Sequence, residues 1–115
     1  MSITKTKIKN IIARGGATLN KQGIAKNYKC GYQVSKKDLF ILDIEQIEQI
    51  TTTINNTLNN MQKNDFCGLW VDDNKIYIDL SIKINNKQKA INFGKKLKQI
   101  SIFEWATKNC IYLKY

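Results

Sequence analysis

The chain has 115 residues, with nineteen basic and nine acidic side chains, a formal net charge of +10, three cysteines and no histidine. This length suits one domain with a single core. Without histidine, Ser-His-Asp and Cys-His catalysis and His-ligated zinc are excluded. The cysteines lack C-x-x-C spacing. We therefore expect reduced thiols, with no metal and no cofactor.

The chain contains no stretch of eighteen apolar residues, and its N-terminus alternates lysine with isoleucine and threonine. The first pattern excludes a membrane-spanning helix, and the second excludes the apolar centre of a signal peptide. We expect a soluble, intracellular protein without a membrane partner.

Residues 2–13 predict a short helix capped by Ser2 or Thr4 and ended by the glycines at 15–16. Its polar side would carry three basic residues, which are candidate nucleic-acid contacts or simply a solvated face: Lys5, Lys9 and Arg14. Residues 17–28 are polar, and we expect them to be irregular, with a turn at 20–23.

Alternating apolar residues predict a strand over 28–35 and a second over 39–42, separated by a turn at 36–38. A helix should follow from Asp43 to about Lys63. Its apolar stripe has spacings of three, four and seven, and consists of Ile44, Ile47, Ile54, Leu58 and Met61. Such a stripe indicates a core face, with a dimer seam as the alternative.

Residues 66–84 predict a β-hairpin that turns at 72–74, because Asp and Asn favour turn conformations. In its second strand, isoleucine or leucine occupies every other position from Ile76 to Ile84, which indicates one buried face. The opposite face carries Tyr77 and Asp79.

Residues 87–98 predict a helix capped by the asparagines at 85–86, with lysines on its outer and C-terminal part: Lys89, Lys95, Lys96 and Lys98. Two strands should follow, at 100–105 and 110–113. The predicted fold is α+β, approximately αββαββαββ, with about six short strands in a mostly antiparallel sheet and three helices on one side.

Charge is unevenly distributed along the chain. Residues 1–37 carry nine basic and no acidic side chains, residues 38–79 carry eight acidic and two basic ones, and residues 80–115 carry eight basic and one acidic. This pattern predicts a basic face and an acidic face. The candidates for partner contact on the acidic side are Glu45, Glu48, Asp72, Asp73 and Asp79, and on the basic side Lys89, Lys95, Lys96 and Lys98, with Trp70 and Tyr77 as aromatic anchors.

Five short blocks resemble a family of small proteins carried by bacteriophages and mobile elements of bacteria. They are residues 15–19 (GGATL), 31–35 (GYQVS), 68–70 (GLW), 77–81 (YIDLS), and Ala90 with Gly94, Gln99, Ile102 and Phe103. The family's aromatic-Asp ending is replaced here by Phe103-Glu104-Trp105. The resemblance implies an accessory protein that acts in the cytoplasm of a bacterial host, where small non-enzymatic proteins often inhibit defence systems, as anti-CRISPR proteins do.

Three functions follow as hypotheses. The first is a non-enzymatic inhibitor, a monomer or homodimer, that binds a host immune nuclease or its ribonucleoprotein complex and blocks access of nucleic acid. The second is a nucleic-acid-binding protein whose lysines contact phosphates while Tyr or Trp stacks on bases. The third is a small enzyme acting on nucleotides through Asp79 or Cys30. Tyr32 and Trp105 are further candidates for an exposed aromatic contact.

Overall fold

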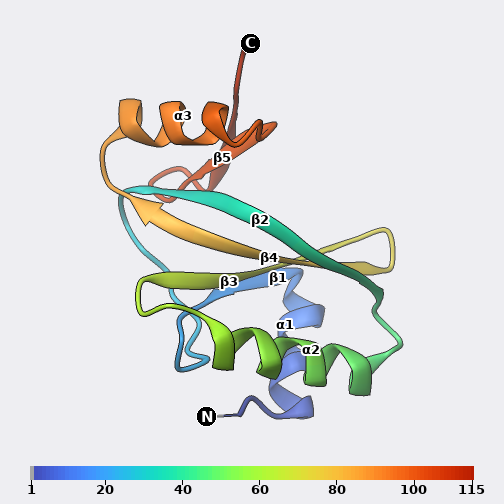
Figure 1. Cartoon of the computed structure of the whole chain (residues 1–115). Coiled ribbons are helices and arrows are strands. Elements are labelled where there is room, and N and C mark those ends of the chain that lie inside the picture. Colours follow the sequence, from blue (N-terminus) through green and yellow to red (C-terminus); the bar gives the residue numbers. More distant parts are fainter. Residues whose placement is uncertain (1) are drawn as a thin grey trace.

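A computed structural model describes residues 2–115 and shows an α+β protein (Figure 1). The elements in chain order are α1 (Lys5–Arg14), β1 (Gly16–Leu19), β2 (Tyr32–Asp43), α2 (Ile47–Asn60), β3 (Asp65–Asp72), β4 (Lys75–Ile84), α3 (Lys87–Lys96), β5 (Ser101–Glu104) and β6 (Asn109–Tyr112). The order αββαββαββ is the predicted one.

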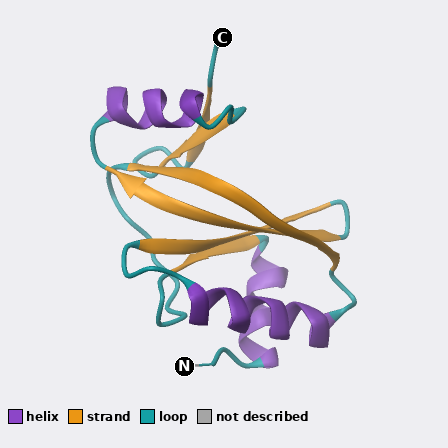
Figure 2. Ribbon diagram, in the orientation of Figure 1, coloured by secondary structure: helices purple, strands orange, loops and turns teal. Residues whose placement is uncertain are grey.

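The six strands form one antiparallel sheet in the order β1-β3-β4-β2-β5-β6. The long strands β2 and β4 lie at its centre (Figure 2). Asp73 and Asn74 connect β3 to β4 with positive φ angles of 49° and 61°. This is the pattern of a two-residue hairpin turn, so the predicted hairpin is confirmed.

The first two strands differ from the prediction. The segment expected to be irregular contains β1, which pairs with β3. At Gly16, a Cβ atom would collide with the carbonyl oxygen of Leu69, so only glycine lets the two backbones approach. Four residues are too few to show a periodicity, which is why the pattern did not reveal this strand.

The turn predicted at 36–38 is also wrong, because β2 runs continuously along β4. Two irregularities of register, between Ser35 and Lys37 and between Asp38 and Phe40, accommodate the polar residues without ending the strand. The side chain of Lys36 points to β3, where its Nζ lies 2.8 Å from Asp65 Oδ1. A β-bulge and a turn share the same local sequence, and only pairing with β4 distinguishes them.

The helix ends follow local chemistry. Thr4 Oγ1 accepts a hydrogen bond from the Lys7 backbone N–H (3.2 Å), and Gly15 ends α1 with φ of 93°. Asn86 Oδ1 accepts in the same way from the Lys89 backbone N–H (2.9 Å). By contrast, α2 is shorter at both ends than the predicted helix at 43–63. It begins later because Asp43 is the last residue of β2, and it ends at Asn60 because Met61 has an extended backbone.

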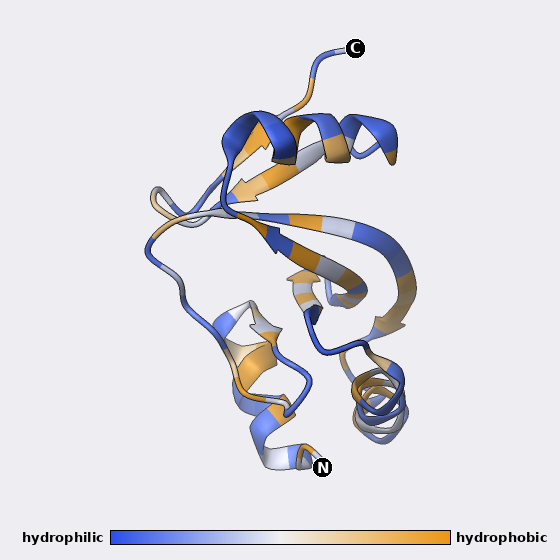
Figure 3. Ribbon diagram, turned by 60° about the vertical axis from the view of Figure 1, so that its left-hand side comes forward, coloured by the Kyte–Doolittle hydropathy of each residue, from blue (hydrophilic) through white to orange (hydrophobic). Residues whose placement is uncertain are grey.

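The apolar core lies on one face of the sheet. Helices α1 and α2 cover its β1-β3-β4 half through buried residues such as Ile8, Ile54 and Ile78. Helix α3 covers the other half, where Ala90 packs against Val34 and Ile102. Figure 3 shows the resulting alternation of hydrophobic and hydrophilic segments along the central strands.

The core uses only part of each predicted stripe. Ile76 and Ile78 are fully buried, whereas the positions from Leu80 to Ile84 are half-buried. The stripe of α2 packs inside this chain, through Ile50, Ile54 and Leu58. It therefore serves as a core face and is not free to form a dimer seam.

Among residues 2–115, no helix is both long enough and apolar enough to cross a lipid bilayer.

Candidate functional site

Three exposed apolar side chains stand in one row across the helix-free face of the sheet. Trp70 of β3 pairs with Tyr77 of β4, which pairs with Ile41 of β2. Their exposed fractions are 51%, 37% and 60%. Cross-strand partners have neighbouring side chains, so these three form a continuous apolar strip.

Two acidic residues lie beside this strip. Asp72 ends β3 and Asp73 begins the turn, and both are exposed. Neither carboxylate forms an ion pair with any part of the chain that the structure describes. We call the five residues Ile41, Trp70, Asp72, Asp73 and Tyr77 the hairpin end. It brings together four residues predicted as partner contacts and adds Ile41, whose strand position gave no sign of exposure.

The same face curls into a groove. Strands β3 and β5 are three positions apart in the sheet, which corresponds to about 14 Å in a flat sheet. Yet the ring centroids of Trp70 and Phe103 are only 6.1 Å apart. The curled sheet encloses a cavity of about 530 Å³ between its two halves, a volume typical of small-molecule sites.

Aromatic side chains form one wall of the groove. Phe103 contacts Trp70 and also Trp105, with ring centroids 5.1 Å apart in the second pair. Trp105 is 5% exposed, and its Nε1–H donates to Gln33 Oε1 (3.1 Å). Gln33 Nε2 in turn donates to Ser81 Oγ (2.9 Å). These hydrogen bonds fix the wall to the polar floor.

The floor holds two buried oxygen atoms without a hydrogen-bond partner in residues 2–115: Ser35 Oγ and Asp79 Oδ1. Both side chains line the groove. Buried polar atoms are almost always paired, so two such atoms in one cavity call for an explanation. Asp79 pairs in register with Asp38 of β2, another carboxylate in the lining.

Burial raises the pKa of Asp79 from 3.8 to about 6, and the negative charge of Asp38 adds to the increase, while the nearby backbone of Gly68 opposes it. The groove therefore contains a carboxylate that ionises near neutral pH and that no cation of residues 2–115 pairs with.

Gly68 provides the space for this carboxylate. A Cβ atom at Gly68 would collide with Asp79 Oδ1. We expect Gly68→Ala to lower the free energy of unfolding by about 1–3 kcal/mol, because overpacking displaces a short side chain. Urea denaturation measures this change. Gly23→Ala is not a suitable control because φ at Gly23 is positive, unlike φ at Gly68. Ser101→Ala, on the groove lining, should change it by less than about 0.5 kcal/mol.

The rim of the groove is basic. Arg14, at the end of α1, and Lys26, after β1, both line the cavity, together with the backbone of Gly15 and Gly16. Neither basic side chain forms an ion pair within residues 2–115. The rim can therefore attract an anionic group while the floor attracts hydrogen-bond donors.

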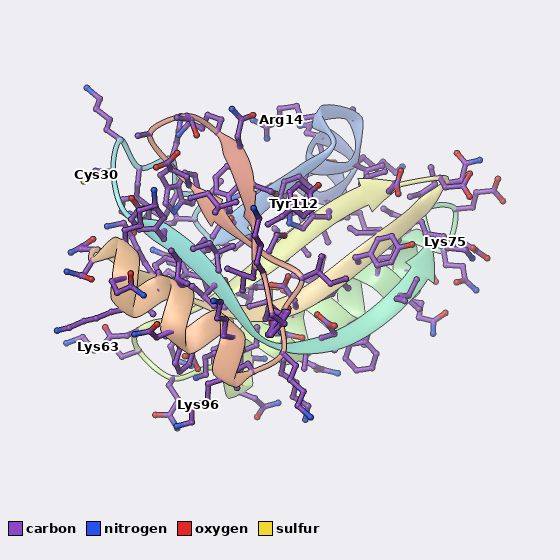
Figure 4. All side chains as sticks on the ribbon, turned by 90° about the horizontal axis from the view of Figure 1, so that it is seen from above. Arg14, Cys30, Lys63, Lys75, Lys96 and Tyr112 are labelled. Carbon is purple, nitrogen blue, oxygen red and sulfur yellow. The ribbon has the colours of Figure 1, made fainter. Side chains whose placement is uncertain are left out.

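The remaining predicted contacts do not gather into two opposed faces. Lys5 Nζ lies 2.7 Å from Glu48 Oε1, so the basic helix α1 and the acidic segment meet each other. Glu45 is exposed in the turn before α2, and Lys9 is exposed on α1. Lys89, Lys95, Lys96 and Lys98 are all exposed in or just after α3. Figure 4 shows Arg14 and Lys96 at opposite edges of the molecule, so the two basic segments are separate surfaces.

Two aromatic candidates and one acidic candidate are placed differently from the prediction. Trp105 is buried in the groove wall. Tyr32 is half-buried against the core beneath α3, which contains Val34 and Ala90, and its hydroxyl donates to Glu104 Oε2 (3.4 Å). Asp79 lies at the floor of the groove and not on an outer acidic face. Curling of the sheet buries Trp105 and Asp79, which line the groove. Tyr32 is covered for another reason, because it shares the core face with Val34 beneath α3.

The three thiols differ in exposure. Burial raises the pKa of Cys67 to about 12, with a further contribution from Asp79, so this thiol stays protonated. Cys30 and Cys110 are exposed. We expect a thiol reagent such as Ellman's reagent to label two cysteines in the native protein and three after denaturation. Labelling of three in the native state would contradict the structure.

Within the described residues, no group of three or more Cys, Asp or Glu side chains is placed to hold a metal ion.

The floor residues Gln33, Ser35 and Ser81 were missed as site residues. They lie on alternating strand positions, where polar residues usually face water. All five short sequence blocks quoted in the sequence analysis contribute to the groove: residues 15–18, Gln33 with Ser35, residues 68–70, Asp79 with Ser81, and Gln99 with Phe103. This convergence was not apparent from their order along the chain.

The fold and the groove define a class: an α+β protein whose curled antiparallel sheet has helices on one face and a cavity on the other. The chain matches no protein-family model, no curated protein and no solved structure.

Proposed function

We propose that this protein is a non-enzymatic inhibitor that places its hairpin end on a basic, nucleic-acid-binding surface of a host immune nuclease. The observation that carries the proposal is the exposed row of Trp70, Tyr77 and Ile41 beside Asp72 and Asp73. A few side chains, most often Trp, Tyr and Arg, supply most of the binding energy at protein interfaces. Unpaired carboxylates next to them favour a basic partner.

The charge of the rest of the molecule limits the choice of partner. The protein carries +10 overall, so a basic surface is repelled except where acidic residues are presented together. The hairpin end is such a place. Nucleic-acid channels of nucleases are basic because they hold phosphates, and the resemblance to phage accessory proteins supports a nuclease of bacterial defence as the partner.

The test measures target-DNA cleavage by a panel of purified RNA-guided nucleases with and without the protein. We expect wild type to inhibit at least one nuclease, and Asp72→Lys with Asp73→Lys to abolish inhibition. Tyr77→Ala should weaken it by about tenfold or more. Tyr112→Ala is the matched control, because Tyr112 is an exposed tyrosine on β6, outside the hairpin end.

Two results would overturn the proposal. One is that wild type inhibits none of the nucleases. The other is that the doubly charge-reversed variant inhibits as strongly as wild type.

Binding of nucleic acid through the lysines is the second candidate. It is favoured by the exposed lysines of α3, none of which forms an ion pair with another described residue. This function predicts affinity for mixed-sequence single strands that falls steeply between low and physiological salt. Replacing Lys89, Lys95 and Lys96 with glutamine should then reduce the slope, whereas an affinity independent of salt would exclude this candidate.

A further inference from the structure

The groove has features that binding through the hairpin end does not use. It is a cavity of about 530 Å³ with a polar floor, an aromatic wall and a basic rim. Of the residues that define the hairpin end, only Trp70 also lines it. A ligand for the groove can therefore be inferred separately from the nuclease.

The floor requires hydrogen-bond donors. Asp79 Oδ1 is buried and has no hydrogen-bond partner among the described residues, and Asp38 presents a second carboxylate directly across the strand pair. Ser35 Oγ, also without a partner, can donate or accept. An ionised carboxylate binds best to a group that presents two N–H donors side by side.

The wall requires a flat ligand. Trp70 is half-exposed, and its ring meets Phe103 edge to face. Aromatic rings of this kind stack on planar heterocycles, and such stacking is a main source of affinity for nucleobases. The hydrogen bonds from Trp105 to Gln33 and from Gln33 to Ser81 hold the wall rigidly against the floor.

The rim requires an anion. Arg14 and Lys26 line the same cavity as the carboxylates of the floor and stay outside ion-pairing distance of any described acidic side chain. A ligand with donors at one end and a negative group at the other would satisfy both parts. A nucleotide has this polarity.

We propose that the groove binds a guanine nucleotide, with the base at the floor and the phosphate at the rim. Guanine is the base whose Watson–Crick edge presents adjacent donors, N1–H and the 2-amino group, to a carboxylate. Adenine and cytosine present one donor beside an acceptor, and uracil one donor between two acceptors, so each would place an acceptor against Asp79. The nucleotide is either free or part of a single strand.

The raised pKa of Asp79 agrees with this site, since paired donors stabilise the ionised carboxylate and relieve the repulsion from Asp38.

The test follows the intrinsic fluorescence of the two tryptophans, both in the groove lining, and calorimetry during titration with GMP, AMP, CMP and UMP. We expect GMP to bind at least about tenfold more tightly than the other three. Asp79→Asn should remove this preference, because an amide presents a donor to the donors of guanine. Asp73→Asn is the matched control outside the groove and should leave GMP binding unchanged.

Two further arms identify the source of the ligand and the role of the rim. Guanosine should bind less tightly than GMP, and Arg14→Gln should reduce that difference. If a G-containing single strand binds more tightly than GMP, the base belongs to a nucleic acid; if GMP binds more tightly, it belongs to a free nucleotide.

The proposal is overturned if no nucleotide binds, if the four nucleotides bind equally, or if agmatine binds in place of GMP, which would make the groove a cation site. It is also overturned if folded Asp79→Asn, checked by circular dichroism, keeps the preference for GMP. Ser35→Ala is a second variant with the same expected direction. None of these results affects nuclease inhibition, which is tested at Asp72, Asp73 and Tyr77.

Discussion

Replacement of Ile78 by alanine should lower the free energy of unfolding by about 2–5 kcal/mol. Ile78 is 1% exposed on the central strand β4, where it belongs to the cluster that joins α1 and α2 to the sheet. Removing its side chain loses apolar burial and leaves a cavity that rigid neighbours on both sides cannot fill. Urea denaturation followed by circular dichroism measures the change.

Ile100→Ala is the matched control for this prediction. This substitution removes the same atoms at a position that is 76% exposed, so the free energy of unfolding should change by less than about 0.5 kcal/mol. Equal effects of the two substitutions would mean that the core is not where the structure places it.

Replacement of Asp79 by asparagine should instead stabilise the protein, by up to about 3 kcal/mol above pH 7. The pKa of this carboxyl is 3.8 in its ordinary state and about 6 in the folded protein. Raising the pKa from 3.8 to about 6 disfavours the ionised form relative to the protonated form by about 3 kcal/mol. Asparagine resembles the protonated form in size and has no charge to bury.

The pH dependence has a definite sign. Because the folded pKa is raised, the folded state binds more protons than the unfolded state between about pH 4 and pH 6. The carboxyl of Asp79 therefore reduces stability as pH rises through this window. The stability gained by Asp79→Asn should be near zero below pH 4, grow between pH 4 and 6, and be constant above pH 7.

Thermal and urea unfolding of wild type and variant across pH 3.5–8 measure this difference. Asp72→Asn, at an exposed carboxylate, is the matched control and should change the free energy of unfolding by less than about 0.5 kcal/mol. Asp38→Asn should reproduce part of the effect, because it removes the second cause of the raised pKa. A variant less stable than wild type at pH 7.5 would show that Asp79 is paired in the folded state.

A stabilising substitution that abolishes ligand binding is the expected behaviour of a binding residue. Functional sites often hold charged groups that reduce the stability of the free protein. Asp79 shows this behaviour if Asp79→Asn raises the free energy of unfolding and lowers the affinity for GMP.

Much of the fold follows from local patterns. The caps at Thr4 and Asn86, the turn at Asp73 and the alternation from Ile76 to Ile84 each depend on neighbours within a few residues. Such features are set by backbone geometry and hydrophobic period, which a single sequence displays. The α+β class and the order of elements were therefore predictable.

The wrong predictions concern strands whose formation depends on segments distant in the sequence. Strand β1 exists because Gly16 allows close approach to β3, and β2 continues past Lys36 because β4 supplies partners for its backbone. The pattern near each site is compatible with a loop or a turn. Pairing across the sheet, which no local window contains, selects the strand.

For the candidate sites, the sequence alone determined the absence of histidine chemistry, the excess of lysine and the aromatic and acidic residues of the β3–β4 hairpin. Only the tertiary structure decided that Trp105 is buried, that Glu48 pairs with Lys5, and that Asp79 lies in a cavity with Ser35. The reason is the curl of the sheet. It brings β5 over a face that strand alternation predicts to be open, and so converts exposed polar positions into the floor of a groove.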